Sequence, residues 1–246
     1  YIEDEIADHP RTKKLIKRFP SATIISCTRY TEIFNRKSQN FRLQKKNPAL
    51  ILAKKYKGMV LPTPKHYGIG AKYNYYFSHM LNCIYDCRYC FLQGMFRSAH
   101  YILFVNYEDF IDEINSTLNK HASDNVHFFS GYDCDSLALD SVSNFISDFL
   151  PFFENHQNTL IELRTKSTQI KSLLQRSSIS NCIVAFSFTP NEIAKALEHK
   201  TPSVSKRLEA IIELQKVGWK IGLRFDPLIY TKTFTKEYNE LFDNIF

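Results

Sequence analysis

Three cysteines in one short segment constrain this chain more than any other feature. Cys83, Cys87 and Cys90 follow a Cys-x3-Cys-x2-Cys spacing, and Tyr89 directly precedes the third cysteine. Thiolates at this spacing converge when the loop wraps around a metal centre, and three of them can hold three irons of a cubane iron–sulfur cluster. The fourth iron then stays open to a small-molecule ligand. The spacing therefore predicts a centre that carries out chemistry as well as electron transfer.

Other interpretations of the same cysteines are open at this point. Three buried structural cysteines can fall at this spacing by chance, and a zinc site could use His79, His66 or His100 as the fourth ligand. Structural zinc sites usually use paired Cys-x2-Cys knuckles, and this segment has one such pair. Cys134 could complete a cluster that has four protein ligands.

Length and composition indicate an ordinary globular protein of one or two domains. The chain has 246 residues, of which 44% are hydrophobic and 23% charged. The six cysteines are mostly scattered, which favours reduced thiols and a cytoplasmic location over a disulfide framework. No apolar run is long enough to span a bilayer, so we expect no membrane partner. The chain starts with Tyr1 and lacks a signal-peptide pattern, so we expect a trimmed N-terminus.

The basic character is confined to the N-terminal quarter. Residues 11–75 contain 16 Lys and Arg side chains and a single acid, Glu32. Tyr30, Phe34 and Tyr56 are interleaved with these basic residues. Such a stretch can attract a polyanion, so DNA contact through this quarter is one expectation. The alternative is a solvated face, or basic side chains that neutralise acidic loops elsewhere in the chain.

Alternating strand and helix patterns begin near residue 72. Apolar runs predict five strands with helices between them, which is the pattern of a parallel α/β sheet or barrel. The expected strands are 73–80, 126–131, 159–163, 182–188 and 219–225. The expected helices are 107–121, 140–153, 168–174, 202–217 and one that begins near Lys236. We therefore divide the chain into a basic N-terminal module, residues 1–71, and an α/β core, residues 72–246.

The N-terminal module has weaker signals. Residues 22–27 form a short apolar run that favours a strand. Pro48 followed by Ala49, Leu50 and Ile51 favours a helix that starts there, because proline is well tolerated in the first helical turn.

The cysteine segment resembles the radical S-adenosylmethionine (SAM) superfamily. The flanking Phe91-Leu92-Gln93-Gly94 is similar to the spore photoproduct lyase family. This resemblance implies a partial (β/α)6-type barrel with a basic N-terminal extension, a [4Fe–4S] cluster and SAM as cofactors. It also implies reduction by a protein such as flavodoxin or ferredoxin. The sixth strand of such a barrel is missing, so we expect that a C-terminal part is absent.

The resemblance also assigns residues to SAM. It places Tyr89 beside the adenine, whereas a core aromatic is the simpler alternative. Gly131, Asp135 and Ser136, at the end of the second strand, correspond to groups that hold the methionine amino group. The alternative for this segment is a turn followed by a helix cap at Asp140 or Ser141.

Two later strand ends complete the expected SAM site. Lys166 corresponds to a lysine that pairs with the SAM carboxylate, and its alternative is an exposed loop lysine. Ser187 resembles a serine near SAM and could instead be a buried strand serine. Arg207 corresponds to the usual arginine of the family, and its alternative is a salt bridge at a helix start.

Two positions depart from the family. Those lyases have a cysteine after the second strand that returns a hydrogen atom to the product radical, and Tyr132 occupies that position here. A tyrosine follows their third cluster cysteine, and this chain has Phe91. Cys134 and Tyr132 are therefore the two candidates for hydrogen return.

The sequence thus predicts a radical SAM lyase acting on DNA pyrimidine lesions, that is, a DNA repair enzyme. One alternative is a radical SAM enzyme with a non-DNA substrate. Another is a non-catalytic nucleic-acid-binding protein stabilised by zinc or a cluster.

Overall fold

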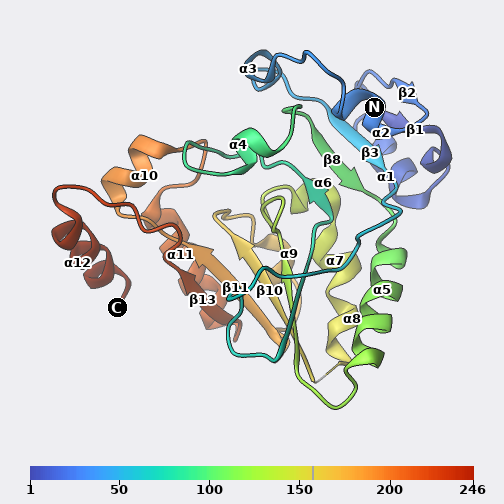
Figure 1. The fold of residues 1–246 in the computed structure, drawn as a ribbon. Helices are drawn as coiled ribbons and strands as arrows, with labels where there is room; N and C mark the ends of the chain where they lie inside the picture. The colour runs from blue at the N-terminus through green and yellow to red at the C-terminus, as the bar shows by residue number, and fades with distance from the viewer. Residues whose placement is uncertain (157) are drawn as a thin grey trace.

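A six-stranded sheet forms the centre of the molecule (Figure 1). The computed structural model describes residues 1–156 and 158–246. Five strands run parallel, in the order β13-β11-β10-β9-β5, and β4 is added antiparallel to β5. Their bounds are Leu61–Pro62 (β4), Tyr73–Phe77 (β5), Val126–Ser130 (β9), Thr159–Thr165 (β10), Cys182–Ser187 (β11) and Lys220–Arg224 (β13).

The strands occur in sequence order because each is followed by a helical connection back to the start of the next. The connecting helices are Tyr107–Lys120 (α5), Asp140–Ser143 (α6), Phe145–Phe149 (α7), Pro151–Glu154 (α8), Lys171–Leu174 (α9), Asn191–Leu197 (α10) and Val204–Lys216 (α11), and Phe234–Ile245 (α12) follows the last strand. Phe77, Phe128, Phe149 and Phe153 are fully buried between the sheet and the helices. Aromatic packing of this kind removes a large apolar area from water and is the main stabilisation of the core.

The alternating pattern predicted from sequence is confirmed, with the first strand shortened and one helix divided. The expected strand at 73–80 ends at Phe77, and Met80 belongs to a strand of a second sheet. The expected helix at 140–153 is three short helices, α6, α7 and α8. Asn144 adopts a left-handed conformation with φ 54°, which ends α6. Pro151 starts α8, and the Asp140 carboxylate accepts a hydrogen bond from the amide of Ile146 at 2.8 Å. Asp140 therefore caps α7 rather than a single long helix.

A second sheet of five strands packs at one end of the molecule, with the strand order β2-β1-β3-β8-β6. Its strands are Ile2–Glu3 (β1), Ser26–Cys27 (β2), Leu50–Ala53 (β3), Met80–Leu81 (β6) and Tyr101–Phe104 (β8). The helices around it are Asp4–Ile6 (η1, a 3-10 helix), Pro10–Arg18 (α1), Tyr30–Phe34 (α2), Phe41–Gln44 (α3) and Leu92–Met95 (α4). The expected strand at 22–27 is therefore reduced to its last two residues.

The helix expected from Pro48 is wrong. Residues Leu50–Ala53 form β3, which lies between β1 and β8 and pairs in parallel with both. Ile51 and Ala53 are fully buried. Short apolar runs do not distinguish a helix from a buried strand by themselves, and here the sheet partners decide. Strand β8, which supplies one of those partners, was not predicted.

The sheet of the N-terminal module continues past residue 71. Both β6 and β8 belong to it, although they follow β5 in the chain. Arg11 of α1 further connects the two regions, because its guanidinium donates to Glu108 at 2.7 Å and Asp148 at 3.0 Å. The division into two domains at residue 71 stays a prediction. The backbone pairing of β3 with β8 joins the N-terminal module to the α/β core.

Part of the N-terminal basic charge is paired with acids of the α/β core. Besides Arg11, Lys45 lies 3.4 Å from Asp86, and Lys72 lies 3.2 Å from Asp124. These pairs agree with the expectation that some basic side chains neutralise acidic loops. Arg36, Arg42 and Lys46 are exposed.

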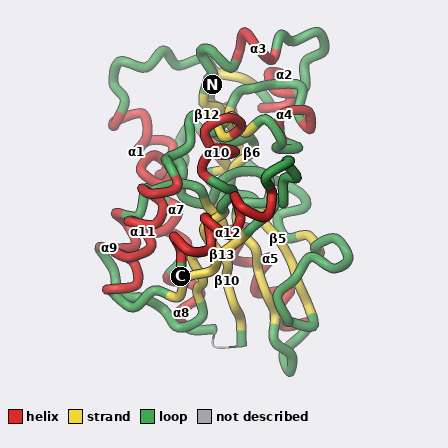
Figure 2. The backbone as a smooth tube through the Cα atoms, turned by 90° about the vertical axis from the view of Figure 1, so that its left-hand side faces the viewer, coloured by secondary structure: helices red, strands yellow, loops and turns green. Residues whose placement is uncertain are grey.

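The carboxyl ends of the parallel strands point toward α4 and α10 (Figures 1 and 2). A short two-stranded sheet also lies at this end, where Asp86–Cys87 (β7) pairs antiparallel with Glu198–His199 (β12). The α/β class is confirmed, and the six-stranded barrel stays a prediction. Within the described residues, no helix has the length and apolar character needed to cross a membrane.

Candidate active site

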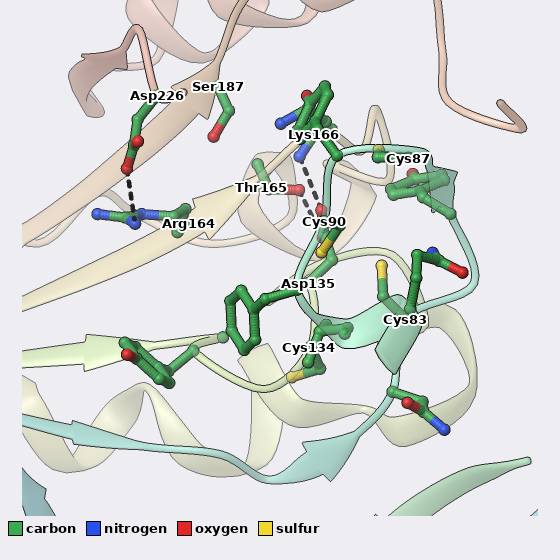
Figure 3. A pocket seen from close by; sticks show the side chains of 18 of the residues that line it. Cys83, Cys87, Cys90, Cys134, Asp135, Arg164, Thr165, Lys166, Ser187 and Asp226 are labelled. Carbon is green, nitrogen blue, oxygen red and sulfur yellow. Dashed lines mark hydrogen bonds and ion pairs between the residues drawn. The ribbon is translucent and has the colours of Figure 1, made fainter. Parts of the chain in front are cut away.

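One cavity of about 340 Å³ lies at the carboxyl ends of β9, β10 and β11 (Figure 3). The cysteine segment forms one wall, and the loops after the strands form the others. Ligand sites of parallel α/β sheets collect at this end, because the strand order brings several loops together there. The predicted site residues that line it are Cys83, Cys87, Tyr89, Cys90, Gly131, Tyr132, Cys134, Asp135, Lys166 and Ser187.

The three cysteines are free thiols in one loop between β6 and α4. Burial raises the pKa of Cys87 to about 11 and holds the pKa of Cys83 well above its usual value. The thiols of Cys83 and Cys87 therefore keep their protons in the absence of a metal, and a metal must displace these protons on binding. Among the described residues, no three His, Cys, Asp or Glu side chains are close enough to hold a single metal ion. Three thiols around an open cavity fit a larger polynuclear cluster.

The histidines considered for a zinc site lie elsewhere. His79 is buried and stacks on Phe145 with ring centroids 3.9 Å apart. His100 accepts a hydrogen bond from the Ala49 amide at 3.0 Å, and His66 is exposed. None of these three borders the cysteine cavity.

The loop after β9 is folded around Asp135. One carboxylate oxygen accepts from the amides of Leu137 and Ala138, each at 2.9 Å, and from the Thr165 hydroxyl at 2.7 Å. The other accepts from the Lys166 amide at 2.7 Å. Burial raises the pKa of Asp135, although these hydrogen bonds act in the opposite direction. Asp135 thus fastens the β9 loop to the end of β10 and keeps one oxygen with a remaining lone pair.

Gly131 and Ser136 form the base of this loop. Gly131 has φ +81°, and a Cβ atom there would come within 2.5 Å of the Ser136 hydroxyl oxygen. Only glycine fits such a turn without strain. Ser136 lies behind the loop, where its hydroxyl donates to Ser130 at 3.2 Å and its amide to the Arg164 carbonyl at 3.0 Å. It does not border the cavity, so its predicted contact with the methionine amino group is not supported.

A buried carboxylate, Glu198 of β12, joins the polar residues of the site. Its Oε1 accepts from the Tyr89 hydroxyl and from Thr189 at 3.0 Å, and Lys166 Nζ lies 3.8 Å away. Its Oε2 accepts from Arg207 at 2.5 Å. Burial opposes ionisation of Glu198, but Lys166 and Arg207 outweigh it, so its pKa is lowered. Lys166 is therefore not the exposed loop lysine of the alternative, and Arg207 does form a salt bridge.

The rings of Tyr67, Phe91 and Tyr132 form an aromatic wall of the cavity. Tyr132 stacks on Tyr76 with centroids 4.3 Å apart and meets Tyr67 at 5.6 Å and Phe91 at 5.8 Å. The guanidinium of Arg164 lies 4.9 Å from the Tyr67 ring centroid. Phe91 is 54% exposed. A wall of rings with a nearby cation is suited to planar, electron-rich ligands such as nucleobases.

Comparison with known proteins decides the family. A model of the family "Spore photoproduct lyase" matches residues 1–246. The chain belongs to the spore photoproduct lyase family. The curated relatives include the spore photoproduct lyase of Bacillus subtilis (strain 168), 22% identical over 250 residues, which cover 100% of this chain and 71% of the relative. The enzyme of Clostridium acetobutylicum is 24% identical over 169 residues, which cover 68% of this chain and 50% of the relative.

Solved structures of the family share the fold. A spore photoproduct lyase mutant with bound AdoMet and dinucleoside spore photoproduct matches with a TM-score of 0.88 at 19% identity. A spore photoproduct lyase complexed with dinucleoside spore photoproduct matches with a TM-score of 0.87 at 20% identity. Both matches cover 100% of this chain and 72% of the other.

Membership confirms the predicted superfamily, enzyme class and cofactors. Spore photoproduct lyases are radical SAM lyases that use a [4Fe–4S] cluster and SAM. The residues of this chain fit those groups, because the three thiols, Lys166 and Ser187 border one cavity large enough for a ligand. The roles of the individual site residues stay predictions.

Sequence analysis missed part of this site. Glu198 is not among the predicted site residues. Tyr67 and Arg164 also border the cavity, one from the connector before β5 and the other from the end of β10. Arg164 directly follows the expected strand at 159–163, and a charged residue at a strand end is a weak signal for a binding site. Tyr67 stands in an irregular connector that gives no local signal.

Proposed function

We propose that this chain binds SAM and a [4Fe–4S] cluster in the cavity and acts as a lyase on a pyrimidine lesion in DNA. The convergence of three free thiols, Tyr89, Lys166 and Ser187 on one cavity carries the proposal. When bound, the reduced cluster and SAM supply a 5′-deoxyadenosyl radical that abstracts hydrogen from substrate. Family membership supports the DNA lesion as substrate, because three of the similar structures hold the dinucleoside spore photoproduct.

The chain's own residues bind, orient and enclose the reactants. Cys83, Cys87 and Cys90 would ligate three irons, and the ammonium of Lys166 would pair with the carboxylate of SAM. The aromatic wall would stack against the lesion base and keep water from the radical.

Tyr132 is the favoured hydrogen donor to the product radical. Its ring borders the cavity and contacts Phe91, the position where the family has a tyrosine. The step breaks the Tyr132 O–H bond and forms a C–H bond on the product, which leaves a tyrosyl radical. One electron from the protein reductant and one proton from solvent then restore the phenol.

Cys134 is the second candidate and has less support. Its side chain is only 8% exposed, and its sulfur is directed away from those of Cys83 and Cys90 (Figure 3). Burial, together with the nearby Asp133 and Asp135, raises its pKa. Replacing Cys134 by alanine without any change in product would exclude it as the donor.

Exposed basic residues near the cavity support DNA contact by the N-terminal quarter. Lys45 borders the cavity just after α3, and the neighbouring Arg42 and Lys46 are exposed. An Arg42→Glu/Lys46→Glu variant should weaken binding to lesion DNA and reduce the salt dependence of binding by roughly two counterions. A Lys13→Glu/Lys17→Glu variant on α1 makes the same charge change away from α3 and is the control. Equal losses in both variants would contradict a specific role for the α3 region.

A protein reductant such as flavodoxin or ferredoxin and a cytoplasmic location are parts of the same proposal. Free thiols at all six cysteines support a reducing compartment.

The decisive experiment is anaerobic reconstitution with iron and sulfide, followed by dithionite and SAM, with and without an oligonucleotide that carries the spore photoproduct. Chromatography follows 5′-deoxyadenosine and the loss of the lesion. A Cys83/Cys87/Cys90→Ala variant should lose both activities, whereas Cys27→Ala, a buried cysteine on β2, should keep them. Deoxyadenosine without repair would favour the non-DNA substrate, and a cluster without deoxyadenosine would favour the non-catalytic protein. Bound zinc without iron would overturn the cluster.

A further inference from the structure

Glu198 occupies a position that needs an explanation beyond folding. Its side chain and that of Arg207 are completely buried. A buried carboxylate is costly unless charged partners and hydrogen bonds compensate for its lost hydration. Its partners come from several segments: Tyr89 from the cysteine loop, Lys166 from the end of β10, Thr189 from the end of β11 and Arg207 from α11.

The backbone of Glu198 is attached to the cysteine loop as well. Glu198 pairs with Cys87 in the β7–β12 ladder, and the Arg88 amide donates to the Leu197 carbonyl at 2.8 Å. The segment at 197–199 therefore touches the loop twice, once through the backbone and once through the Tyr89 hydroxyl. A shift of this segment would move the thiols of the loop.

Arg207 extends the network to Ser187, another residue assigned to SAM. Its guanidinium donates to the Ser187 carbonyl at 2.9 Å, to the Pro202 carbonyl at 3.0 Å and to the Thr201 hydroxyl at 2.9 Å. Three residues assigned to SAM, namely Tyr89, Lys166 and Ser187, are thus all in contact with Glu198 or with its partner Arg207.

The charged side chains of this network leave one positive charge, which can be balanced by one anionic group of a ligand. Lys166 and Arg207 carry two positive charges and Glu198 one negative charge, so one positive charge is left. The guanidinium of Arg207 is enclosed by its own partners, whereas Lys166 borders the cavity. At 3.8 Å from Glu198, the ammonium is held by charge attraction and keeps its donors for a ligand. The remaining charge is therefore presented to the cavity at Lys166.

We infer that Glu198 is a positioning residue that aligns the cysteine loop, Tyr89 and Lys166 with one another for SAM. The inference rests on the proposed function, because it concerns the same cavity. Glu198 does not touch the reactants; it acts through Tyr89, through Lys166 and through the β7–β12 pairing.

A Glu198→Gln variant distinguishes positioning from simple charge effects. Removing a negative charge near Lys166 should strengthen the binding of a carboxylate ligand if only charge matters. If Glu198 instead aligns Tyr89 and Lys166, the variant should bind SAM about tenfold more weakly or worse, because hydrogen bonds to charged groups are lost. Equilibrium dialysis of SAM on reconstituted protein with wild-type iron content measures the difference. We expect weaker binding, and tighter or unchanged binding would overturn the inference.

Tyr89→Phe provides a milder test that leaves the buried Glu198–Arg207 pair in place. It should weaken SAM binding less than Glu198→Gln and change the electron paramagnetic resonance signal of the reduced cluster in the presence of SAM. Glu209→Gln, on the exposed face of α11, should change neither. An unaltered signal in both site variants would contradict the positioning role.

Hydrogen exchange of the protein without cofactors tests the loop separately. Glu198→Gln should speed exchange of the Arg88 amide, which bonds to Leu197, relative to wild type and Glu209→Gln. Unchanged exchange there would overturn the link between Glu198 and the cysteine loop. These measurements need no DNA substrate, so failure of lesion repair and failure of this inference can be told apart. If the wild-type chain forms no cluster, the hydrogen-exchange experiment still tests the link between Glu198 and the cysteine loop.

Discussion

The two walls of the cavity are built on different physical principles. The polar wall consists of Lys166 and Tyr89, which border the cavity, and of Glu198 and Arg207, which support them without bordering it. It depends on directed hydrogen bonds and ion pairs between buried groups. The aromatic wall, with Tyr132 and its neighbouring rings, depends on ring contacts at centroid distances of 4.3–5.8 Å.

This difference predicts which half of the site tolerates substitution. Directed bonds in a buried place fail when one partner changes, because the other partner is left unpaired. Ring packing tolerates exchange of one aromatic for another. Tyr132 and Phe91, the two positions at which the sequence resemblance predicts a departure from the family, both lie on the aromatic wall. In the proposed function the polar wall would face the cofactor, whose chemistry is constant, and the aromatic wall is the half that would set the substrate.

Removal of the Lys166 ammonium should give the largest effect. We expect Lys166→Met to weaken SAM binding by about 10- to 100-fold, since a charge-assisted hydrogen bond is worth about 1.5–3 kcal/mol. Equilibrium dialysis measures the loss. Lys171→Met, an exposed lysine on α9, is the matched control and should bind SAM like wild type. A small effect at Lys166 would break the comparison, because the polar wall would then not hold the cofactor.

Loss of the Tyr132 hydroxyl should separate the two walls. Tyr132→Phe keeps the ring contacts but has no O–H bond to give. SAM binding should stay within about twofold of wild type, whereas the yield of repaired lesion per 5′-deoxyadenosine should fall several-fold. Both products are measured in the same chromatographic run. Full repair by this variant would remove Tyr132 as donor and return attention to Cys134.

Removal of the Thr189 hydroxyl tests whether each hydrogen bond to Glu198 contributes to stability. Thr189→Val keeps the shape of the side chain but removes one donor to Glu198, which Tyr89 and Arg207 still satisfy. We expect a loss of about 1 kcal/mol in the free energy of unfolding, measured by urea denaturation. Thr235→Val, exposed on α12, should change stability far less. Equal stability of both variants would mean that the third bond to Glu198 contributes nothing.

The aromatic wall should respond to pH only under alkaline conditions. Burial raises the pKa of Tyr67 to about 12 from 10.0. Between these values the unfolded chain releases the proton that the folded protein keeps, so stability falls as pH rises above 10. Absorbance titration at alkaline pH measures the ionisation of the tyrosines. The Tyr67→Phe variant should lack one phenol that titrates near pH 12 in the wild-type protein. If the variant instead lacks a phenol that titrates near pH 10, the Tyr67 ring is not shielded from water.

Local patterns determined much of this protein from sequence alone. The order of the five parallel strands of the central sheet, and of most helices between them, follows from apolar periodicity, which each segment carries by itself. The cysteine loop and the turn at Gly131 were predictable for the same reason, because spacing and backbone conformation are local properties. The confirmed cofactors followed from residues 83–94, all within one loop.

The tertiary structure decided what depends on distant partners. Leu50–Ala53 forms a strand because β1 and β8 lie on either side of it. Ser136 lies behind the loop because Ser130 and Arg164 hold it there. Tyr89 meets Glu198 across 109 residues of sequence. Such contacts leave no periodic trace in either segment, so only the packing of the sheet and its loops could bring the buried carboxylate to the cysteine loop.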